Sequence, residues 1–77
     1  MLKSLLEYIA KSLVDYPEDV SVTEVDDERG LVLELRVRDT DMGKVIGKQG
    51  RIAKSIRAVM KAAASRENQK VVVDIVD

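Results

Sequence analysis

The chain of 77 residues contains no cysteine, histidine, phenylalanine or tryptophan. Without cysteine there is no disulfide or thiolate nucleophile, and without histidine there is no imidazole base or imidazole metal ligand. These absences exclude most hydrolytic and redox chemistry, so we expect no enzymatic activity, no cofactor and no metal site. The two tyrosines, Tyr8 and Tyr16, are too few for the aromatic platform on which many single-strand binders stack bases. The core must therefore be aliphatic.

The sequence also lacks the signals of export and membrane insertion. No basic segment precedes a long apolar run with a cleavage site, and apolar runs such as residues 71–73 are far shorter than the roughly 20 residues of a membrane span. A chain of this length has room for one small domain, here residues 1–77. We expect that domain to be cytoplasmic, with no membrane contact and no small-molecule substrate.

Apolar periodicity predicts six elements. Helical spacing indicates helices over residues 2–14 and 51–66, the second with an apolar face of Ile52, Ile56, Val59, Met60 and Ala63. Alternation indicates strands over residues 20–25, 31–38 and 71–76. Asp39, Thr40 and Asp41 offer side-chain acceptors that suit the N-terminus of a short helix over residues 42–46. Pro17 is expected to end the first helix.

The order of these elements predicts a two-layer α+β fold. The short polar turn over residues 26–30 makes the first two strands antiparallel, whereas a two-helix crossover favours a parallel third strand. We therefore expect a three-stranded mixed sheet with three helices packed on one face.

Charge is unevenly distributed along the chain, although its net value is only −1. Residues 42–66 contain no acidic residue and seven basic ones: Lys44, Lys48, Arg51, Lys54, Arg57, Lys61 and Arg66. One interpretation is that these side chains merely solvate a helix. A solvated helix face ordinarily mixes charge signs for i, i+4 pairs, however, so a run of one sign favours contact with a polyanion.

The basic run contains the glycine pair of Gly47-Lys48-Gln49-Gly50. By itself this spacing is a weak signal, because a helix C-cap glycine followed by a turn glycine produces the same pattern. Its position between two predicted helices makes it more specific. Glycines allow a tight turn and close approach of a ligand, and the start of the following helix attracts phosphate.

The stretch over residues 43–52, within this order of elements, resembles the KH domain, and the resemblance covers the whole chain. The α-β-β-α-α-β order is similar to the type II arrangement, in which a Gly-x-x-Gly loop holds the backbone of about four single-stranded nucleotides. The resemblance implies binding of single-stranded RNA, with single-stranded DNA as an alternative. Small bacterial proteins of this kind are associated with post-transcriptional regulation or RNA chaperoning. They are also associated with self-association, pairing with a larger KH-containing protein, and cell elongation and division.

The resemblance also assigns roles to residues. Gly47 to Gly50 would contact phosphates, with Lys48 as a solvent-facing charge and Gln49 as a polar contact. The neighbouring cations that it implicates are Lys44, Arg51 and Lys54, and its aliphatic groove would contain Val45, Ile46 and Ile52. A core role is the alternative for these three residues. Arg36 or Arg38 would lie nearby. The acidic residues 26–28 would occupy the family's variable loop, which disfavours tight or extended binding.

Other classes fit less well. The glycine spacing matches neither a P-loop nor a dinucleotide fingerprint. The main alternative function is a protein-interaction module for dimerisation or adaptor binding. It would use a strip of small residues on the long helix, formed by Ser55, Ala58, Ala62 and Ser65. On sequence alone, helix propensity explains the same strip slightly better than a partner surface does.

Overall fold

The computed structural model describes residues 1–76. Its helices and strands are α1 (Leu2–Leu13), β1 (Ser21–Asp27), β2 (Gly30–Arg36), α2 (Met42–Ile46), α3 (Arg51–Arg66) and β3 (Val71–Ile75). Three short 3-10 turns join them: η1 (Pro17–Asp19), η2 (Asp39–Asp41) and η3 (Lys48–Gly50). All six predicted elements are confirmed: α2 and α3 have the predicted bounds, and the ends of the other four differ by at most two residues. Among the described residues, no helix has the length and hydropathy that a membrane crossing requires.

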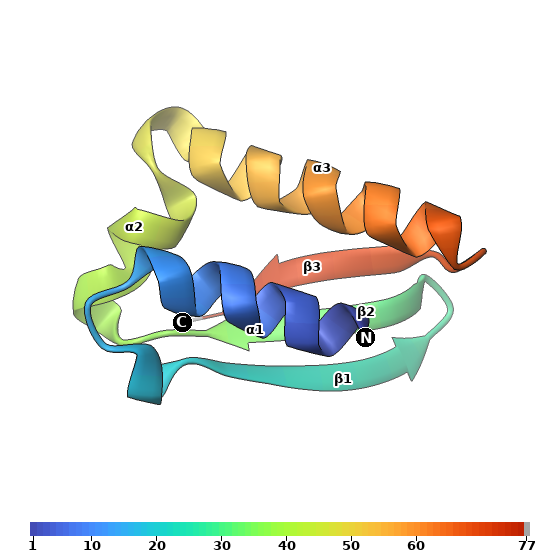
Figure 1. Ribbon diagram of the computed structural model, residues 1–77, viewed down its shortest axis with the longest axis horizontal. Coiled ribbons are helices and arrows are strands. Elements are labelled where there is room, and N and C mark those ends of the chain that lie inside the picture. The colour runs from blue at the N-terminus through green and yellow to red at the C-terminus, as the bar shows by residue number, and fades with distance from the viewer. Residues whose placement is uncertain (77) are drawn as a thin grey trace.

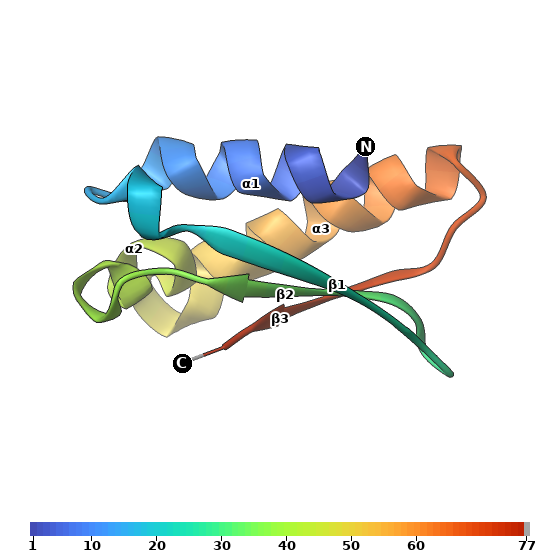
Figure 2. The same ribbon diagram turned by 90° about the horizontal axis from the view of Figure 1, so that it is seen from below.

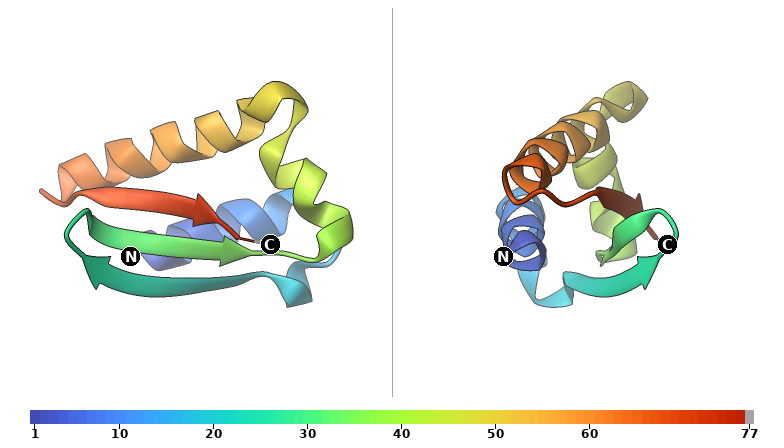
Figure 3. Two further views of the ribbon diagram at one scale, coloured as in Figure 1. Left: turned by 180° about the vertical axis from the view of Figure 1, so that it is seen from behind. Right: turned by 90° about the vertical axis from the view of Figure 1, so that its right-hand side faces the viewer.

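The three strands form one mixed sheet in the order β1-β2-β3. β1 and β2 pair antiparallel across a two-residue turn of Glu28 and Arg29, and β2 and β3 pair parallel. The predicted α+β fold is confirmed, since α1 and α3 cover one face of the sheet and α2 packs beside them at one end (Figures 1 and 2). The β1–β2 turn and the α2–α3 connection lie at opposite ends of the molecule (Figure 3).

The core lies between the helices and the sheet and is aliphatic, as predicted. Leu33 and Leu35 of β2 are fully buried against Leu6 of α1, Val45 of α2 and Met60 of α3. Burial of such side chains contributes about 1.5–3 kcal/mol each. The alternation predicted for β2 is therefore confirmed, with its leucines facing the helices.

The buried face of α3 differs from the predicted one. Its buried residues are Ala53, Ile56, Met60 and Ala64. Val59, expected in the core, is 49% exposed, and Ile52 is only half-buried. The small alanine side chains let α3 approach the sheet closely, so the helix turns its alanine side, rather than Val59, toward the core. Because alanine carries little hydrophobic signal, periodicity alone placed the centre of this face too far toward Val59.

The predicted capping role of Asp41 is wrong. No side chain caps α2; instead the Asp41 carboxylate is fully buried and accepts hydrogen bonds from the backbone N–H of Asp15 at 3.1 Å and Tyr16 at 3.0 Å. These bonds fasten the segment after α1 to the start of α2. A cap satisfies donors of its own helix, whereas here the donors come from a distant segment that ordinary spacing rules do not reveal.

Candidate nucleic-acid interface

The loop Gly47-Lys48-Gln49-Gly50, here called the glycine loop, joins α2 to α3 (Figure 1). Gly47, Gln49 and Gly50 all have positive φ, at 73°, 58° and 71°. The Gly47 N–H bonds to the Gly43 carbonyl at 2.8 Å, and the Gly50 N–H bonds to the Gly47 carbonyl at 3.2 Å. Within residues 1–76, the N–H groups of Lys48 and Gln49 have no protein acceptor. Two backbone donors are therefore free for a ligand.

The loop shape depends on close packing behind Gly47. A β-carbon on Gly47 would lie 2.6 Å from Ile52 Cγ1, a separation that real contacts do not show. A β-carbon on Gly50 would meet no atom within 4 Å, so the space in front of this residue is open. The two glycines thus have different roles, since one permits packing on α3 and the other leaves the loop surface accessible.

Three cations lie in or directly after the glycine loop. Lys48, Arg51 and Lys54 are exposed, and no carboxylate in the described part of the chain forms an ion pair with any of them. The N-terminus of α3 adds the positive end of a 16-residue helix. This end of the molecule therefore carries uncompensated positive charge beside free backbone donors.

Lys44 does not belong to this group of free cations. Its Nζ lies 3.1 Å from Asp15 Oδ2 and 3.8 Å from Asp41 Oδ1, and the hydrogen bond to Asp15, followed by its charge, raises the pKa of Lys44. The ion pairs draw the side chain toward the end of α1. The sequence showed the nearness of Lys44 to the glycines but not this acidic partner 29 residues earlier in the chain.

The three aliphatic residues assigned to the groove have different environments. Val45 is fully buried, so it supports the loop from beneath. Ile52 is half-buried under Gly47 and also lines a groove between α1 and α3. Ile46, 37% exposed at the end of α2, presents aliphatic surface next to the glycine loop. The core alternative therefore suits Val45 and Ile52, and a contact role suits Ile46.

Arg36, the last residue of β2, and Arg38, two residues after it, are held by acidic partners. Arg36 Nη1 lies 3.6 Å from Glu34 Oε1, and Arg38 Nε donates to Asp19 Oδ2 at 2.6 Å. The Arg38 guanidinium also lies 3.7 Å above the Tyr16 ring, and its hydrogen bond to Asp19 raises the pKa of Arg38. These contacts favour a structural role for Arg38, which ties β2 to the η1 segment.

The acidic turn does not flank the glycine loop. Residues 26–28 end β1 and begin the β1–β2 turn, at the opposite end of the sheet from the α2–α3 connection (Figure 3). A ligand held at the glycine loop therefore does not meet this turn directly, because the two are separated by the length of the molecule. The effect of the turn on tight or extended binding stays a prediction.

A row of cations continues from the glycine loop along α3. Lys54, Arg57 and Lys61, here called the basic flank, share one side of the helix next to its buried face, as the helical spacing predicted. The Arg57 Nε donates to the Val73 carbonyl at 3.2 Å, which shows that this side faces β3. The sequence indicated the flank itself, but which strand it faces depends on how α3 lies over the sheet.

The order α-β-β-α-α-β, with a Gly-x-x-Gly loop between two helices beside a mixed sheet, defines the fold as a type II KH domain. The comparison with known families agrees. The family model described as KhpA/KhpB, KH domain, matches residues 3–75, and the chain belongs to this family.

Relatives resemble the chain over nearly its whole length. RNA-binding protein KhpA of Clostridium perfringens is 67% identical over 75 residues, which cover 97% of this chain and 100% of the relative. RNA-binding protein KhpA of Clostridium acetobutylicum is 64% identical with the same coverage. RNA-binding protein KhpA of Chlamydia trachomatis is 45% identical over 76 residues, which cover 99% of this chain and 97% of the relative.

Proposed function

We propose that this chain is an RNA-binding protein that holds the sugar–phosphate backbone of single-stranded RNA at the glycine loop. The observation that carries the proposal is the pair of unbonded N–H groups of Lys48 and Gln49, beside cations that have no carboxylate partner in the described residues. The names of the relatives, which are RNA-binding proteins, support the same conclusion.

The chemistry of this contact follows from the loop. A phosphate oxygen accepts hydrogen bonds from the N–H groups of Lys48 and Gln49, and the open space at Gly50 allows close approach. Lys48 and Arg51 add charge, while Ile46 offers an aliphatic surface to a base or ribose. Without aromatic stacking each nucleotide contributes little binding free energy, so we expect modest affinity for RNA.

The proposed role is that of a post-transcriptional regulator or RNA chaperone that acts in the cytoplasm with a protein partner. That partner would be a second copy of the chain or a larger KH-containing protein of the KhpB type. The family description, which joins KhpA with KhpB, supports a partner of this kind.

The test is a double substitution of Lys48→Asp with Gln49→Asp, measured by fluorescence anisotropy on mixed single-stranded RNA about ten nucleotides long. We expect a loss of affinity of at least about tenfold, because a cation is removed and two anions face the phosphates. For the unsubstituted protein, neutralisation of three or four phosphates gives a slope of about −2 to −3 in log affinity against log salt. The same oligomers made of DNA show whether the 2′-hydroxyl matters.

The control makes the same charge change elsewhere, with Lys11→Asp and Ser4→Asp on the exposed side of α1. It should retain most of the affinity. Equal affinity in the glycine-loop variant and the control, with an unchanged fold, would contradict the proposal. A salt slope indistinguishable from zero would contradict it too.

The second candidate function is self-association through the helical layer, and an apolar groove favours it. The groove, about 480 Å³, lies between α1 and α3 and is lined largely by apolar side chains, among them Tyr8, Leu13 and Val59. These three side chains are 72%, 38% and 49% exposed. The small residues Ser55, Ala58, Ala62 and Ser65 are exposed on α3 as well. We infer that a second copy of the chain covers this surface, which would place two glycine loops in one particle and raise avidity.

A further inference from the structure

One edge of the sheet has no neighbouring element in the described part of the chain. The strand order β1-β2-β3 makes β1 and β3 the two edge strands. Within residues 1–76, no helix or strand lies beside the outer side of β1, because α1 covers a face of the sheet and not this edge (Figures 1 and 2). An uncovered edge presents backbone N–H and C=O groups to which another strand can bond.

The hydrogen bonds between β2 and β3 show which groups of β1 are free. The Leu31 N–H bonds to the Lys70 carbonyl at 3.0 Å, and the Leu35 carbonyl accepts a bond of 2.9 Å from the N–H of residue 76. Odd-numbered residues of β2 therefore bond to β3, and even-numbered ones bond to β1. In the observed register the even-numbered residues of β2 are opposite the odd-numbered residues of β1. The backbone groups of the other residues of β1 point to the outer edge: Val22, Glu24 and Asp26.

The accessible part of this edge lies in the second half of β1. Val22 is buried, whereas Glu24 and Asp26 are exposed. Two N–H groups and two C=O groups are therefore available to a partner strand. Residues 23–27 are here called the open edge, and they lead into the β1–β2 turn, at the far end of the molecule from the glycine loop (Figure 3).

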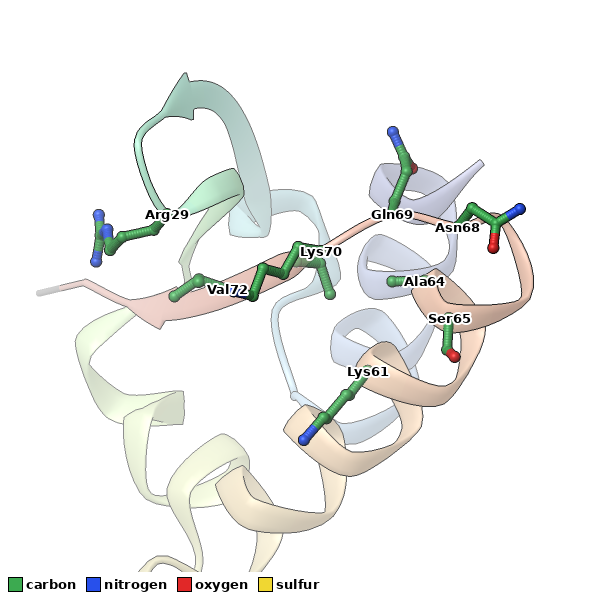
Figure 4. Close-up of a pocket in the computed structure, with 9 residues that line it drawn as sticks. Arg29, Lys61, Ala64, Ser65, Asn68, Gln69, Lys70 and Val72 are labelled. Carbon is green, nitrogen blue, oxygen red and sulfur yellow. The ribbon is translucent and has the colours of Figure 1, made fainter.

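The β3 edge is different, because α3 runs beside it. The Arg57 Nε donates to the Val73 carbonyl at 3.2 Å, so a side chain already occupies a backbone acceptor of this strand. Next to β3 lies a pocket of about 560 Å³, whose lining includes the cations Arg29, Lys61 and Lys70 (Figure 4). The two edges of the sheet thus differ both in cover and in the charge that surrounds them.

The open edge is surrounded by negative charge. Residues 23–28 contain four acidic residues and no basic one. Asp27 is paired with Arg29 at 3.1 Å, but Glu24 and Asp26 form no ion pair with any described residue. Like charge disfavours both RNA and the same edge of a second copy, whereas Lys and Arg side chains are attracted. Charge complementarity therefore points to a basic strand of another protein.

The two faces of β1 define the side chains that such a strand needs. Glu24 is opposite Leu33, which faces the helices, so Glu24 and Asp26 lie on the helix side of the sheet. Thr23 and Val25 lie on the bare side, where Val25 is 38% exposed. Side chains of adjacent strands interact in pairs on each face. Cations on the helix side and β-branched residues on the bare side would match β1.

We propose that the open edge binds an extended segment of a partner protein in which Lys or Arg alternates with β-branched residues. The segment adds a fourth strand beside β1, its backbone bonds to the outward groups of Glu24 and Asp26, and its cations meet their carboxylates. This inference does not depend on RNA binding at the glycine loop, because the two sites share no residue.

The probe is a blocked peptide of seven residues that alternates lysine and valine, measured by fluorescence anisotropy on the full chain. The variant carries Glu24→Lys and Asp26→Lys, and its control makes the same charge change at the exposed Asp39→Lys and Glu67→Lys. We expect the edge variant to bind the peptide at least about tenfold more weakly than the control does. Equal affinity in variant and control would overturn the proposal.

Two further peptides test backbone pairing without any change in the protein. One is N-methylated on its lysine nitrogens and the other on its valine nitrogens. Only every second residue of an added strand bonds to β1, so one peptide should lose at least about fivefold in affinity and the other should not. Equal affinities of the two would show attraction by charge alone and overturn the added strand.

Hydrogen exchange locates the contact. With the unmodified peptide, the amides of Glu24 and Asp26 should exchange at least about fivefold more slowly, since they become donors to the peptide. Unchanged exchange at saturating peptide would contradict the proposal. Protection of these amides that rises with protein concentration, in the absence of peptide, would assign the edge to a second copy and overturn the basic partner.

Discussion

The two glycines that bound the glycine loop are required for different physical reasons. Gly47 has φ 73° and ψ 176°, in a region that only glycine normally occupies, and it packs directly against Ile52. Gly50 has φ 71° and ψ 18°, the left-handed helical conformation, with open space around it. Replacement of either glycine strains the backbone, but only the first also creates a steric clash.

This difference predicts unequal stability losses for Gly47→Ala and Gly50→Ala. We expect Gly50→Ala to lower the free energy of unfolding by about 1–2 kcal/mol, from the left-handed conformation alone. Gly47→Ala should lower it by about 2–4 kcal/mol, because a forbidden conformation and overpacking on Ile52 add together. Urea denaturation followed by circular dichroism measures both values. Equal losses would show that the contact with Ile52 relaxes freely.

At the scale of elements, α2 is only five residues long and depends on its neighbours for its position. The buried Asp41 carboxylate joins it to the segment after α1, and Lys44 adds an exposed ion pair to Asp15 in that segment. Exposed ion pairs contribute about 0–1 kcal/mol, whereas loss of a buried acceptor leaves its donors unsatisfied. Asp41 is therefore the main contact that sets the base of the glycine loop.

We predict that Asp41→Ala lowers the free energy of unfolding by about 2–4 kcal/mol, since the N–H groups of Asp15 and Tyr16 lose their acceptors. Asp41→Asn retains one acceptor oxygen and should lose less. Asp39→Ala, an exposed neighbour, is the matched control and should change stability by no more than about 0.5 kcal/mol. Chemical denaturation gives all three values, and a loss in Asp41→Ala no larger than that of the control would refute the role of this carboxylate.

At the scale of the whole molecule, charge and apolar surface are separated. The acidic residues 26–28 lie at one end, and the glycine loop with its unpaired cations lies at the other (Figure 3). The unpaired cations of the glycine loop attract a polyanion to this site despite the net charge of −1. Between α1 and α3 lies the apolar groove, which reaches Arg51 and Ile52 at the start of α3, so an assembly formed there leaves the β3 side of α3 accessible.

We predict that the protein self-associates and that Val59→Gln shifts it toward monomer. Val59 lines the groove and is 49% exposed, so a polar amide there weakens an apolar contact without a change in charge. Sedimentation analysis over a concentration series should show at least a tenfold weaker dimer. Thr23→Gln, an exposed position on β1, is the control. A protein that stays monomeric at all concentrations without any substitution would contradict the prediction.

The sequence by itself determined what depends on neighbours along the chain: the alternation of β2, the order of the six elements, the glycine loop between two helices, and the basic run from Lys44 to Arg66. Tertiary structure decided what depends on how elements meet. It paired Lys44 with Asp15 and buried the Asp41 carboxylate against the backbone of the segment after α1. It turned Val59 outward and Ala64 inward. It also brought Arg29, Lys61 and Lys70 together around one pocket. Periodicity reports the local conformation of a segment, but contacts between segments arise from packing in three dimensions, where small residues and buried polar groups leave little trace in the sequence.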